Sequence, residues 1–321
     1  MTSDPHNLSP LEDGLDLARA KVAHHVIPSV LRDTPQFEDP LLSTALGRPV
    51  TVKIETLNPL RCFKGRGVSF ALRDVAPGEQ VVCASSGNFG QAVAWVGASR
   101  GAEVRVFVPA GANPAKTARM TAFGAEVVPV DGGLREARRA ADAASTHGGR
   151  LIIDGVDPGV AEGAATIAEE ITRSSDFDVL VAPIGDGSLI TGLALWIRAH
   201  SPRTRIVGVS PASATSMFES WKTGRVVRVD PTTTFAEGLA IPQPHPVALR
   251  RVSRLVDDVV LVTDDDLRRG MDLIARHLSI MAEPAGAAGV AAIATGAIPD
   301  GSVATLVTGA NPRTPDTRAH R

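Results

Sequence analysis

The sequence predicts an α/β protein built on parallel, doubly wound sheets. Over most of the 321 residues, short apolar runs alternate with longer stretches in which apolar residues recur at helical spacing. Several runs end in glycine- and serine-rich turns that open the next helical stretch, as expected where a buried strand passes into a helix. The composition, 44% hydrophobic and 21% charged residues, suits a globular protein with a large core. Its length favours about two domains.

The elements follow one another along the chain. We predict strands where apolar runs are short and bounded by turn residues, and helices where the apolar period lengthens. The predicted strands are residues 50–54, 81–84, 104–108, 127–130, 151–153, 179–182, 206–209, 259–262 and 303–307. The predicted helices are residues 15–27, 41–46, 68–75, 89–100, 115–123, 134–147, 161–172, 189–200, 214–221, 264–278 and 287–295.

The charge and the cysteines limit the classes of partner and compartment. Basic residues number 33 and acidic residues 35, with no basic stripe and interleaved aromatic residues, so neither nucleic acid nor a membrane surface is expected as a partner. No signal peptide or membrane-spanning apolar run is evident. The two cysteines, Cys62 and Cys83, lack disulfide-like spacing. These features predict a cytoplasmic protein in a reducing compartment.

One lysine occupies an unusual place between a strand and a helix. Lys64 follows Phe63, and Gly65 and Gly67 keep the backbone behind it permissive. An amine held against an aromatic ring in a partly dry loop is a usable nucleophile and base. Its carbonyl partner would be pyridoxal phosphate, held as a Schiff base. The alternative is an ordinary solvated lysine.

Two further turns have the composition of anion sites. Residues 85–91, Ser-Ser-Gly-Asn-Phe-Gly-Gln, join a strand to a helix N-terminus, where backbone N–H groups and hydroxyls can bind an anion. Residues 183–192 do the same with three glycines, which let the backbone wrap a phosphate. Helix capping and a plain turn are the respective alternatives. Neither turn has the spacing of the hydrolase, dinucleotide or Walker motifs.

In this order the motifs resemble those of the fold type II pyridoxal-phosphate enzymes (the tryptophan synthase β family), and most of all its threonine dehydratase and serine racemase branch. The lysine loop is similar to Ser-Phe-Lys-x-Arg-Gly with Cys62 in place of serine, and residues 85–91 to Ser-Ser-Gly-Asn-His-Gly-Gln with Phe89 in place of histidine. Residues 185–189 take the place of the tetraglycine phosphate loop, and residues 236–238 resemble Ala-Asp-Gly. The resemblance extends from about residue 15 to residue 311.

The resemblance implies a role for each matching residue. Lys64 would be the catalytic Schiff-base lysine, and Ser86 the serine that acts as an acid in the racemases. The residues expected to bind the cofactor are Phe63, Lys64, Asn88, Gly185, Asp186, Gly187, Ser188, Leu189, Glu283 and Thr308. Those expected to bind the substrate are Ser85, Ser86, Gly87, Asn88 and Gln91. We expect the Asp186 carboxylate to point away from the phosphate, because two anions at close range repel.

The resemblance also implies an architecture. Two doubly wound open-sheet domains would enclose the cofactor, with residues 1–77 and 158–321 forming the large domain and residues 78–157 a small, mobile one. The protein would be a homodimer. The positions of the branch's divalent-cation ligands read Ser210 and Ser216, so we expect no metal.

The implied reaction is β-elimination on a β-hydroxy α-amino acid similar to serine or threonine, giving a 2-oxo acid and ammonia. Thr308 would face the pyridine nitrogen with a neutral hydroxyl, which favours loss of a β-leaving group over transamination. A β-replacing or threonine synthase-like enzyme and an amino-acid racemase are the alternatives. A cofactor-binding relative without turnover is a further one.

Overall fold

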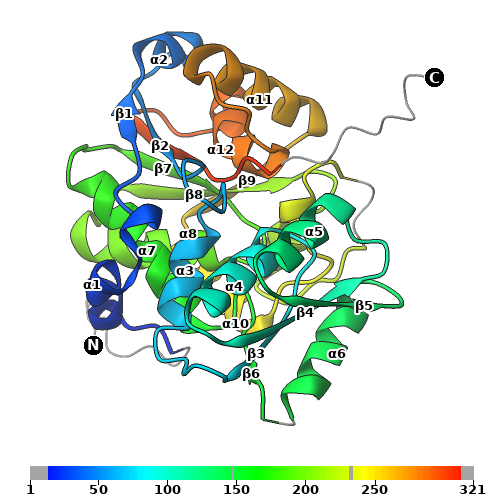
Figure 1. The fold of residues 1–321 in the computed structure, drawn as a ribbon. Coiled ribbons are helices and arrows are strands. Elements are labelled where there is room, and N and C mark those ends of the chain that lie inside the picture. Colours follow the sequence, from blue (N-terminus) through cyan, green and yellow to red (C-terminus); the bar gives the residue numbers. More distant parts are fainter. Residues whose placement is uncertain (1–13, 147, 231–233, 312–321) are drawn as a thin grey trace, which may run out of the picture.

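The computed structural model describes residues 14–311 except 147 and 231–233. It contains a six-stranded sheet with the order β1-β2-β10-β7-β8-β9 and a four-stranded sheet with the order β5-β4-β3-β6 (Figure 1). Every pairing within the two sheets is parallel except that of β1 with β2. The predicted α/β class with two open sheets is therefore confirmed.

The six-stranded sheet has helices on both faces. On one face α7, α8 and α10 cover a core that includes Ile167, Leu193 and Ile206; α11 and α12 cover the other face (Figure 1). Its strands are β1 (Gln36–Glu38), β2 (Val50–Ile54), β7 (Val179–Pro183), β8 (Arg205–Pro211), β9 (Asp258–Val262) and β10 (Val303–Val307). The helices that belong with it are α7 (Pro158–Thr172), α8 (Ser188–His200), α9 (Ser216–Thr223), α10 (Pro246–Leu255), α11 (Asp264–Leu278) and α12 (Pro284–Ala294).

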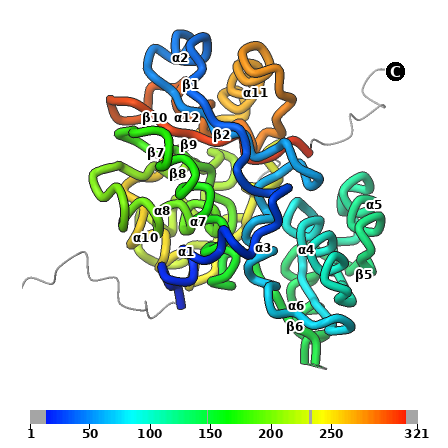
Figure 2. Tube along the Cα trace, turned by 60° about the vertical axis from the view of Figure 1, so that its left-hand side comes forward, coloured from blue at the N-terminus to red at the C-terminus, as the bar shows by residue number. Residues whose placement is uncertain are grey.

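The four-stranded sheet is smaller and lies beside the first (Figure 2). Helices α4 and α5 pack on one side of it and α6 on the other. Its strands are β3 (Gln80–Ala84), β4 (Glu103–Pro109), β5 (Glu126–Val130) and β6 (Arg150–Leu151). The helices are α4 (Asn88–Ser99), α5 (Pro114–Ala122) and α6 (Leu134–Ser145). These elements lie within the predicted small domain; the exact domain boundaries and its mobility stay predictions.

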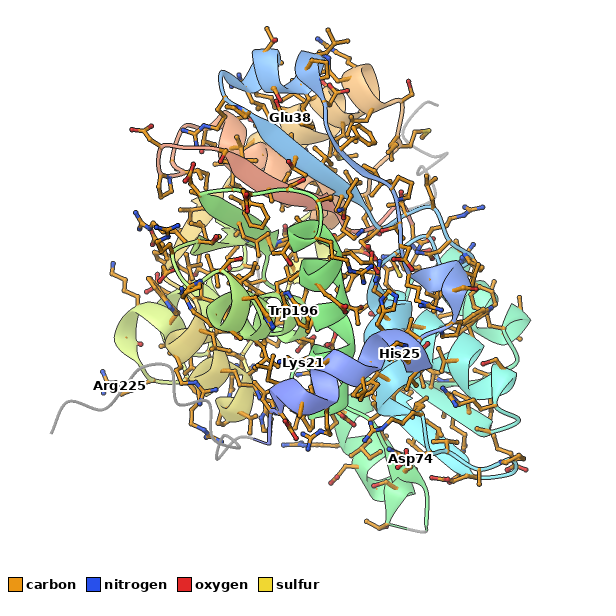
Figure 3. All side chains as sticks on the ribbon, turned by 90° about the vertical axis from the view of Figure 1, so that its left-hand side faces the viewer. Lys21, His25, Glu38, Asp74, Trp196 and Arg225 are labelled. Carbon is orange, nitrogen blue, oxygen red and sulfur yellow. The ribbon has the colours of Figure 1, made fainter. Side chains whose placement is uncertain are left out.

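The N-terminal helices connect the two sheets. Helix α3 (Lys64–Ala71) packs against both α4 and α7. Helix α1 (Leu17–Val26) packs on α7 and α8 through a small cluster of Ala20, Ala165 and Leu195, close to Trp196 (Figure 3). The short helix α2 is Pro40–Leu46, and two 3₁₀ turns are η1 (Ser29–Leu31) and η2 (Glu237–Leu239). Within the described residues, no helix combines the length and the apolar character needed to cross a membrane.

Two local predictions were wrong. Strand β1 was not predicted; it is a three-residue edge strand whose antiparallel pairing with β2 depends on a long-range contact. Helix α3 begins at Lys64 rather than at residue 68. Gly65 and Gly67 have low helix propensity, but they let the first turn of α3 pack closely against its neighbours. A Cβ at Gly67 would lie 2.4 Å from the carbonyl oxygen of Val160 on α7, so only glycine lets the two helices approach this closely.

Candidate functional site

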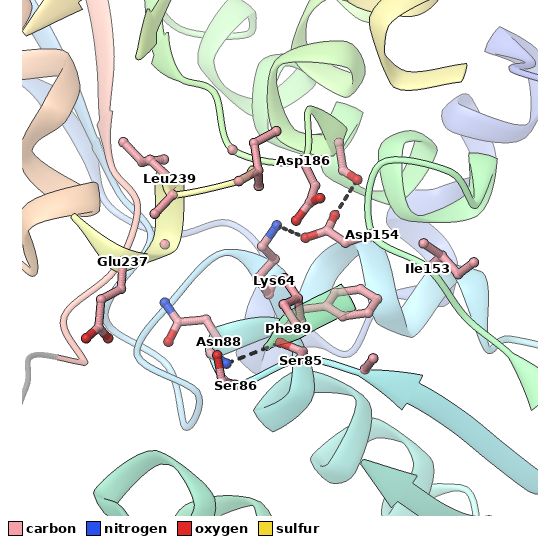
Figure 4. A pocket seen from close by; sticks show the side chains of 18 of the residues that line it. Lys64, Ser85, Ser86, Asn88, Phe89, Ile153, Asp154, Asp186, Glu237 and Leu239 are labelled. Atoms are coloured by element: carbon pink, nitrogen blue, oxygen red, sulfur yellow. Dashed lines mark hydrogen bonds and ion pairs between the residues drawn. The ribbon is translucent and has the colours of Figure 1, made fainter. Parts of the chain in front are cut away.

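A cavity of about 440 Å³ lies between the two sheets, within the size range of small-molecule sites (Figure 4). It is lined by the turns that follow β3, β6, β7 and β10 and by the start of α3. The carboxyl ends of parallel strands are where open α/β sheets bind ligands. Every residue expected to bind cofactor or substrate lines this cavity except Gln91.

Lys64 extends into this cavity from the first position of α3 (Figure 4). Its Nζ lies 4.6 Å from the centre of the Phe63 ring and 6.0 Å from that of Phe89. The same Nζ donates to Oδ2 of Asp154 at 2.5 Å, and the side chains of Lys64 and Asp154 are 16% and 10% exposed. The lysine is therefore held between two aromatic rings and a carboxylate, largely out of water.

The expected phosphate loop joins β7 to α8. Gly187 has a φ of 98°, which glycine adopts without strain, and Ser188 is the first residue of α8. The backbone N–H groups at this helix start are suited to an anion. A Cβ at Gly185 would lie 2.7 Å from the carbonyl oxygen of Gly238, and one at Gly155 2.2 Å from that of Asp186. The loop is thus enclosed by backbone on both sides.

Two aspartates lie in this part of the pocket. Oδ1 of Asp154 accepts a hydrogen bond from the Ser188 hydroxyl at 2.5 Å, and the backbone N–H of Gly155 donates to the same hydroxyl at 2.7 Å. Asp186 lines the pocket (Figure 4), and its carboxylate lies 2.7 Å from Nη2 of Arg138. That this carboxylate points away from the phosphate stays a prediction. Burial raises the pKa of Asp186, and the charge of Arg138 opposes that shift.

The turn of residues 85–88 forms another wall of the cavity. Ser85, Ser86 and Gly87 are half-buried there, and the backbone N–H of Gly87 donates to the Ser85 hydroxyl at 3.2 Å (Figure 4). Gln91 lies one turn further along α4, fully buried, and its amide oxygen accepts from Nε of Arg119 at 2.7 Å. The structure therefore brings the two serines to the pocket but turns Gln91 into the protein interior.

Asn88, the last residue of this turn, lines the cavity together with Glu283 and Thr308. Asn88 donates to Oε1 of Glu283 at 2.6 Å and accepts from Asn311 at 3.2 Å. Burial raises the pKa of Glu283, and Lys116 opposes this through its charge. Thr308 follows β10 with 4% exposure, and its hydroxyl lies 3.5 Å from the carbonyl oxygen of Ala285. Asn88 and Glu283 are thus hydrogen-bonded to each other in the same cavity that Thr308 lines.

Several charged residues of the pocket were not singled out from the sequence. Among them are Asp154, Arg138 and Lys116, and Nζ of Lys116 lies 3.1 Å from a carboxylate oxygen of Glu237. Asp154 carries a usable signal, because it comes shortly after a strand of a parallel sheet. Lys116 lies on α5 and Arg138 on α6. Which face of each helix is turned toward the pocket depends on tertiary packing.

Cys62 is beside Lys64 in sequence but is not available for chemistry. Its side chain is 1% exposed and its backbone pairs with Gly309. Burial raises the pKa of its thiol to about 12, so it stays protonated at neutral pH.

The residues at the expected cation positions offer few ligands. Ser210 is buried in β8, and the Ser216 hydroxyl donates to the carbonyl oxygen of Ile241 at 2.6 Å. Within the described residues, one group could gather three ligand atoms, namely His24, Asp33 and Glu170. Glu170, however, already binds Arg66 and Lys53.

We therefore expect chelators to have no effect. Treating the protein with a chelator should change neither its melting temperature nor its catalytic rate, because hydroxyls without a carboxylate hold Mg²⁺ or Ca²⁺ poorly. Calorimetry and rate assays with and without chelator measure this. A loss of activity that magnesium restores would show that another group of oxygen atoms binds a cation.

Comparisons with known proteins agree with this geometry. A family model described as pyridoxal-phosphate dependent enzyme matches residues 27–309. The L-threonine ammonia-lyases of Thermotoga maritima and Geobacter sulfurreducens are 30% and 33% identical, over 87% and 88% of this chain and 71% and 72% of theirs. The structure of maize serine racemase superposes with a TM-score of 0.87 at 25% identity, covering 92% of this chain and 94% of that one. A chain with this fold and lysine-bearing cleft is an enzyme of the pyridoxal-phosphate class. It belongs to the fold type II family, with threonine dehydratases and serine racemases among its relatives.

The pocket fits the cofactor that the family implies. It offers a lysine amine for the aldehyde, a glycine-bounded helix start for the phosphate, and a buried threonine hydroxyl at a strand end for the ring nitrogen. The residues that would hold pyridoxal phosphate are Phe63, Lys64, Asn88, Gly185, Asp186, Gly187, Ser188, Leu189, Glu283 and Thr308.

Proposed function

We propose that the protein is an ammonia-lyase that eliminates the β-hydroxyl of a serine- or threonine-like amino acid, giving a 2-oxo acid and ammonia. The observation that carries this proposal is the pocket around Lys64, which combines a basic amine with the neutral hydroxyl of Thr308. The threonine ammonia-lyases among the relatives support it.

When bound, pyridoxal phosphate withdraws electrons from Cα of the substrate. Ser85, Ser86 and Gly87 would hold the substrate carboxylate at the start of α4. Nζ of Lys64 would take the Cα proton, and Phe63 and Phe89 limit the access of water to it. Thr308 would meet the ring nitrogen without a charge, which favours loss of the β-substituent over transamination.

A racemase is the second candidate. Racemisation needs an acid on the face of Cα opposite the lysine, and the Ser86 hydroxyl lines the same pocket as Lys64. The serine racemase relative supports this alternative. A β-replacing or threonine synthase-like enzyme stays a further alternative.

The first test is a substrate screen. Purified protein loaded with pyridoxal phosphate is incubated with L-serine, L-threonine and bulkier β-hydroxy amino acids in heavy water. Release of 2-oxo acid and ammonia from at least one of them is expected. If the D-isomer accumulates faster than the 2-oxo acid, the protein is a racemase and the assignment as a lyase is wrong.

Ser86→Ala separates the two candidates further. In a lyase, Lys64 alone handles the Cα proton, so the variant should bind substrate more weakly but still form 2-oxo acid. In a racemase, Ser86 would be the second acid, and its loss should slow D/L interconversion by roughly 10²- to 10⁴-fold. KM, kcat and the D/L ratio of recovered substrate measure the difference. Ser85→Ala is the matched control, because it removes a neighbouring hydroxyl from the same loop.

A further inference from the structure

Asp154 uses both of its carboxylate oxygens inside the pocket. Oδ2 accepts from Nζ of Lys64 and Oδ1 from the hydroxyl of Ser188, each at 2.5 Å (Figure 4). The side chain is only 10% exposed, so water screens these contacts little. One anion therefore joins the lysine expected to bind the aldehyde to the serine expected to bind the phosphate.

The backbone fixes where this carboxylate can lie. Gly155 has a φ of 79°, and a Cβ there would lie 2.2 Å from the carbonyl oxygen of Asp186. Its N–H donates to the Ser188 hydroxyl at 2.7 Å, and its carbonyl oxygen accepts from Nη1 of Arg251 at 3.2 Å. The turn that carries Asp154 is thus locked against the phosphate loop, so Asp154 is not a mobile surface acid.

We propose that Asp154 is the counter-ion of Lys64, a positioning residue whose carboxylate pairs with the ammonium form of this amine, both before the cofactor binds and after the amine has taken a proton. This inference rests on the proposed function in one respect, the role of Lys64 as the base at Cα. Asp154 is in contact with Nζ of Lys64, whereas the neighbouring Asp186 is paired with Arg138.

The proposal has a consequence for cofactor binding. When Nζ forms its C=N bond to the aldehyde carbon, the aldehyde oxygen leaves as water with two of the three ammonium protons. The nitrogen keeps the third proton. The nitrogen then has one N–H in place of three, so Asp154 has fewer donors available to it, and the carboxylate lies near a phosphate at Ser188. Asp154 therefore disfavours the covalently loaded state relative to the free one.

The consequence for turnover has the opposite sign. During the reaction Nζ is released and takes the Cα proton, and the ammonium so formed regains its contact with Asp154. Removing the carboxylate should therefore tighten cofactor binding and slow turnover. A variant that merely disturbs the fold would weaken both.

The test uses the full chain and two variants, Asp154→Asn and Asp154→Ser, which remove the charge but keep a polar side chain. The dissociation constant of pyridoxal phosphate, measured by absorbance, should fall about tenfold, the order set by one charge-assisted hydrogen bond. Pyridoxamine phosphate, which has no aldehyde, should gain less. Turnover at saturating pyridoxal phosphate should fall about tenfold as well.

Asp142→Asn is the matched control. Asp142 is exposed on α6 and lines the same cavity, and its substitution changes the net charge by the same amount. It should leave the affinity for pyridoxal phosphate nearly unchanged. Equal gains for both cofactor forms, or weaker binding of pyridoxal phosphate, would overturn the assignment of Asp154. If no amino acid is turned over by any protein, the proposed function fails while the binding comparison still decides the role of Asp154.

Discussion

Lys64→Ala is expected to lose the covalent bond to pyridoxal phosphate and all measurable turnover. Lys64 lines the cavity at the start of α3, with Nζ 4.6 Å from the centre of the Phe63 ring. General acid–base groups contribute about 10²- to 10⁴-fold to rate. Because Lys64 would also be the group that anchors the cofactor, its removal should cost more than this range.

Borohydride reduction followed by peptide mapping measures the covalent bond directly. In the wild type the reduced cofactor should map to Lys64, and the visible absorbance of the bound cofactor should disappear in the variant. Lys116→Ala is the control, since Lys116 also lines the cavity but is paired with Glu237. A reduced cofactor attached to another lysine in Lys64→Ala would show that the anchor is misassigned.

Arg66→Met is expected to destabilise the fold by about 3–5 kcal/mol, the usual cost of removing one partner from a buried ion pair. Arg66 is 1% exposed and donates to both Glu55 and Glu170. Nζ of Lys53 lies 2.7 Å from Glu170, so the cluster holds two cations and two anions. Methionine would leave two buried carboxylates short of donors.

Arg105→Met provides the matched control for the Arg66 variant. Arg105 pairs with Glu126 at 2.8 Å, but these side chains are 32% and 61% exposed. Exposed pairs contribute at most about 1 kcal/mol. Denaturant unfolding of both variants measures the difference, and equal losses of free energy would contradict the importance of burial for the Arg66 cluster.

The same cluster predicts sensitivity to acid. Burial works against the charge of Glu170, but the hydrogen bond and charge of Arg66, with Lys53, outweigh it and lower the pKa of Glu170 from 4.5 to about 2. A depressed pKa contributes stability above the unfolded value, so this contribution is complete above about pH 4.5 and is lost as the pH falls toward 2. It amounts to about 3 kcal/mol. Unfolding curves measured between these pH values should show that Arg66→Met loses less free energy of unfolding on acidification than the wild type does.

The order of strands, helices and turns could be predicted from the sequence because each depends on residues close together in the chain. The periodicity located most elements, and the turns after β3 and β7 were predicted to be anion sites from their glycine, serine and asparagine residues alone. Phe63 and the two glycines beside Lys64 singled out this lysine, and the family resemblance then supplied roles for the residues around it. All of these signals are local.

Contacts between distant residues could not be predicted in this way. Arg66 meets Glu170 across 104 positions and Lys64 meets Asp154 across 90. Helix α3 begins early because its glycines fit against α7, which no local propensity reveals. Gln91 faces the interior because Arg119, on a different helix, takes its amide oxygen.

The contacts of Gly155 and Gly185 with neighbouring backbone limit how this enzyme can diversify. At both positions any side chain would meet a carbonyl oxygen, at 2.2 Å and 2.7 Å. Those two positions therefore tolerate almost no side chain, whereas cavity-lining positions on α6 such as Arg135 and Asp142 already carry exposed side chains that can be exchanged without moving backbone. Substrate preference is therefore expected to diverge mainly through the cavity-lining side chains of α5 and α6. Mutant libraries designed to change that preference should vary those positions.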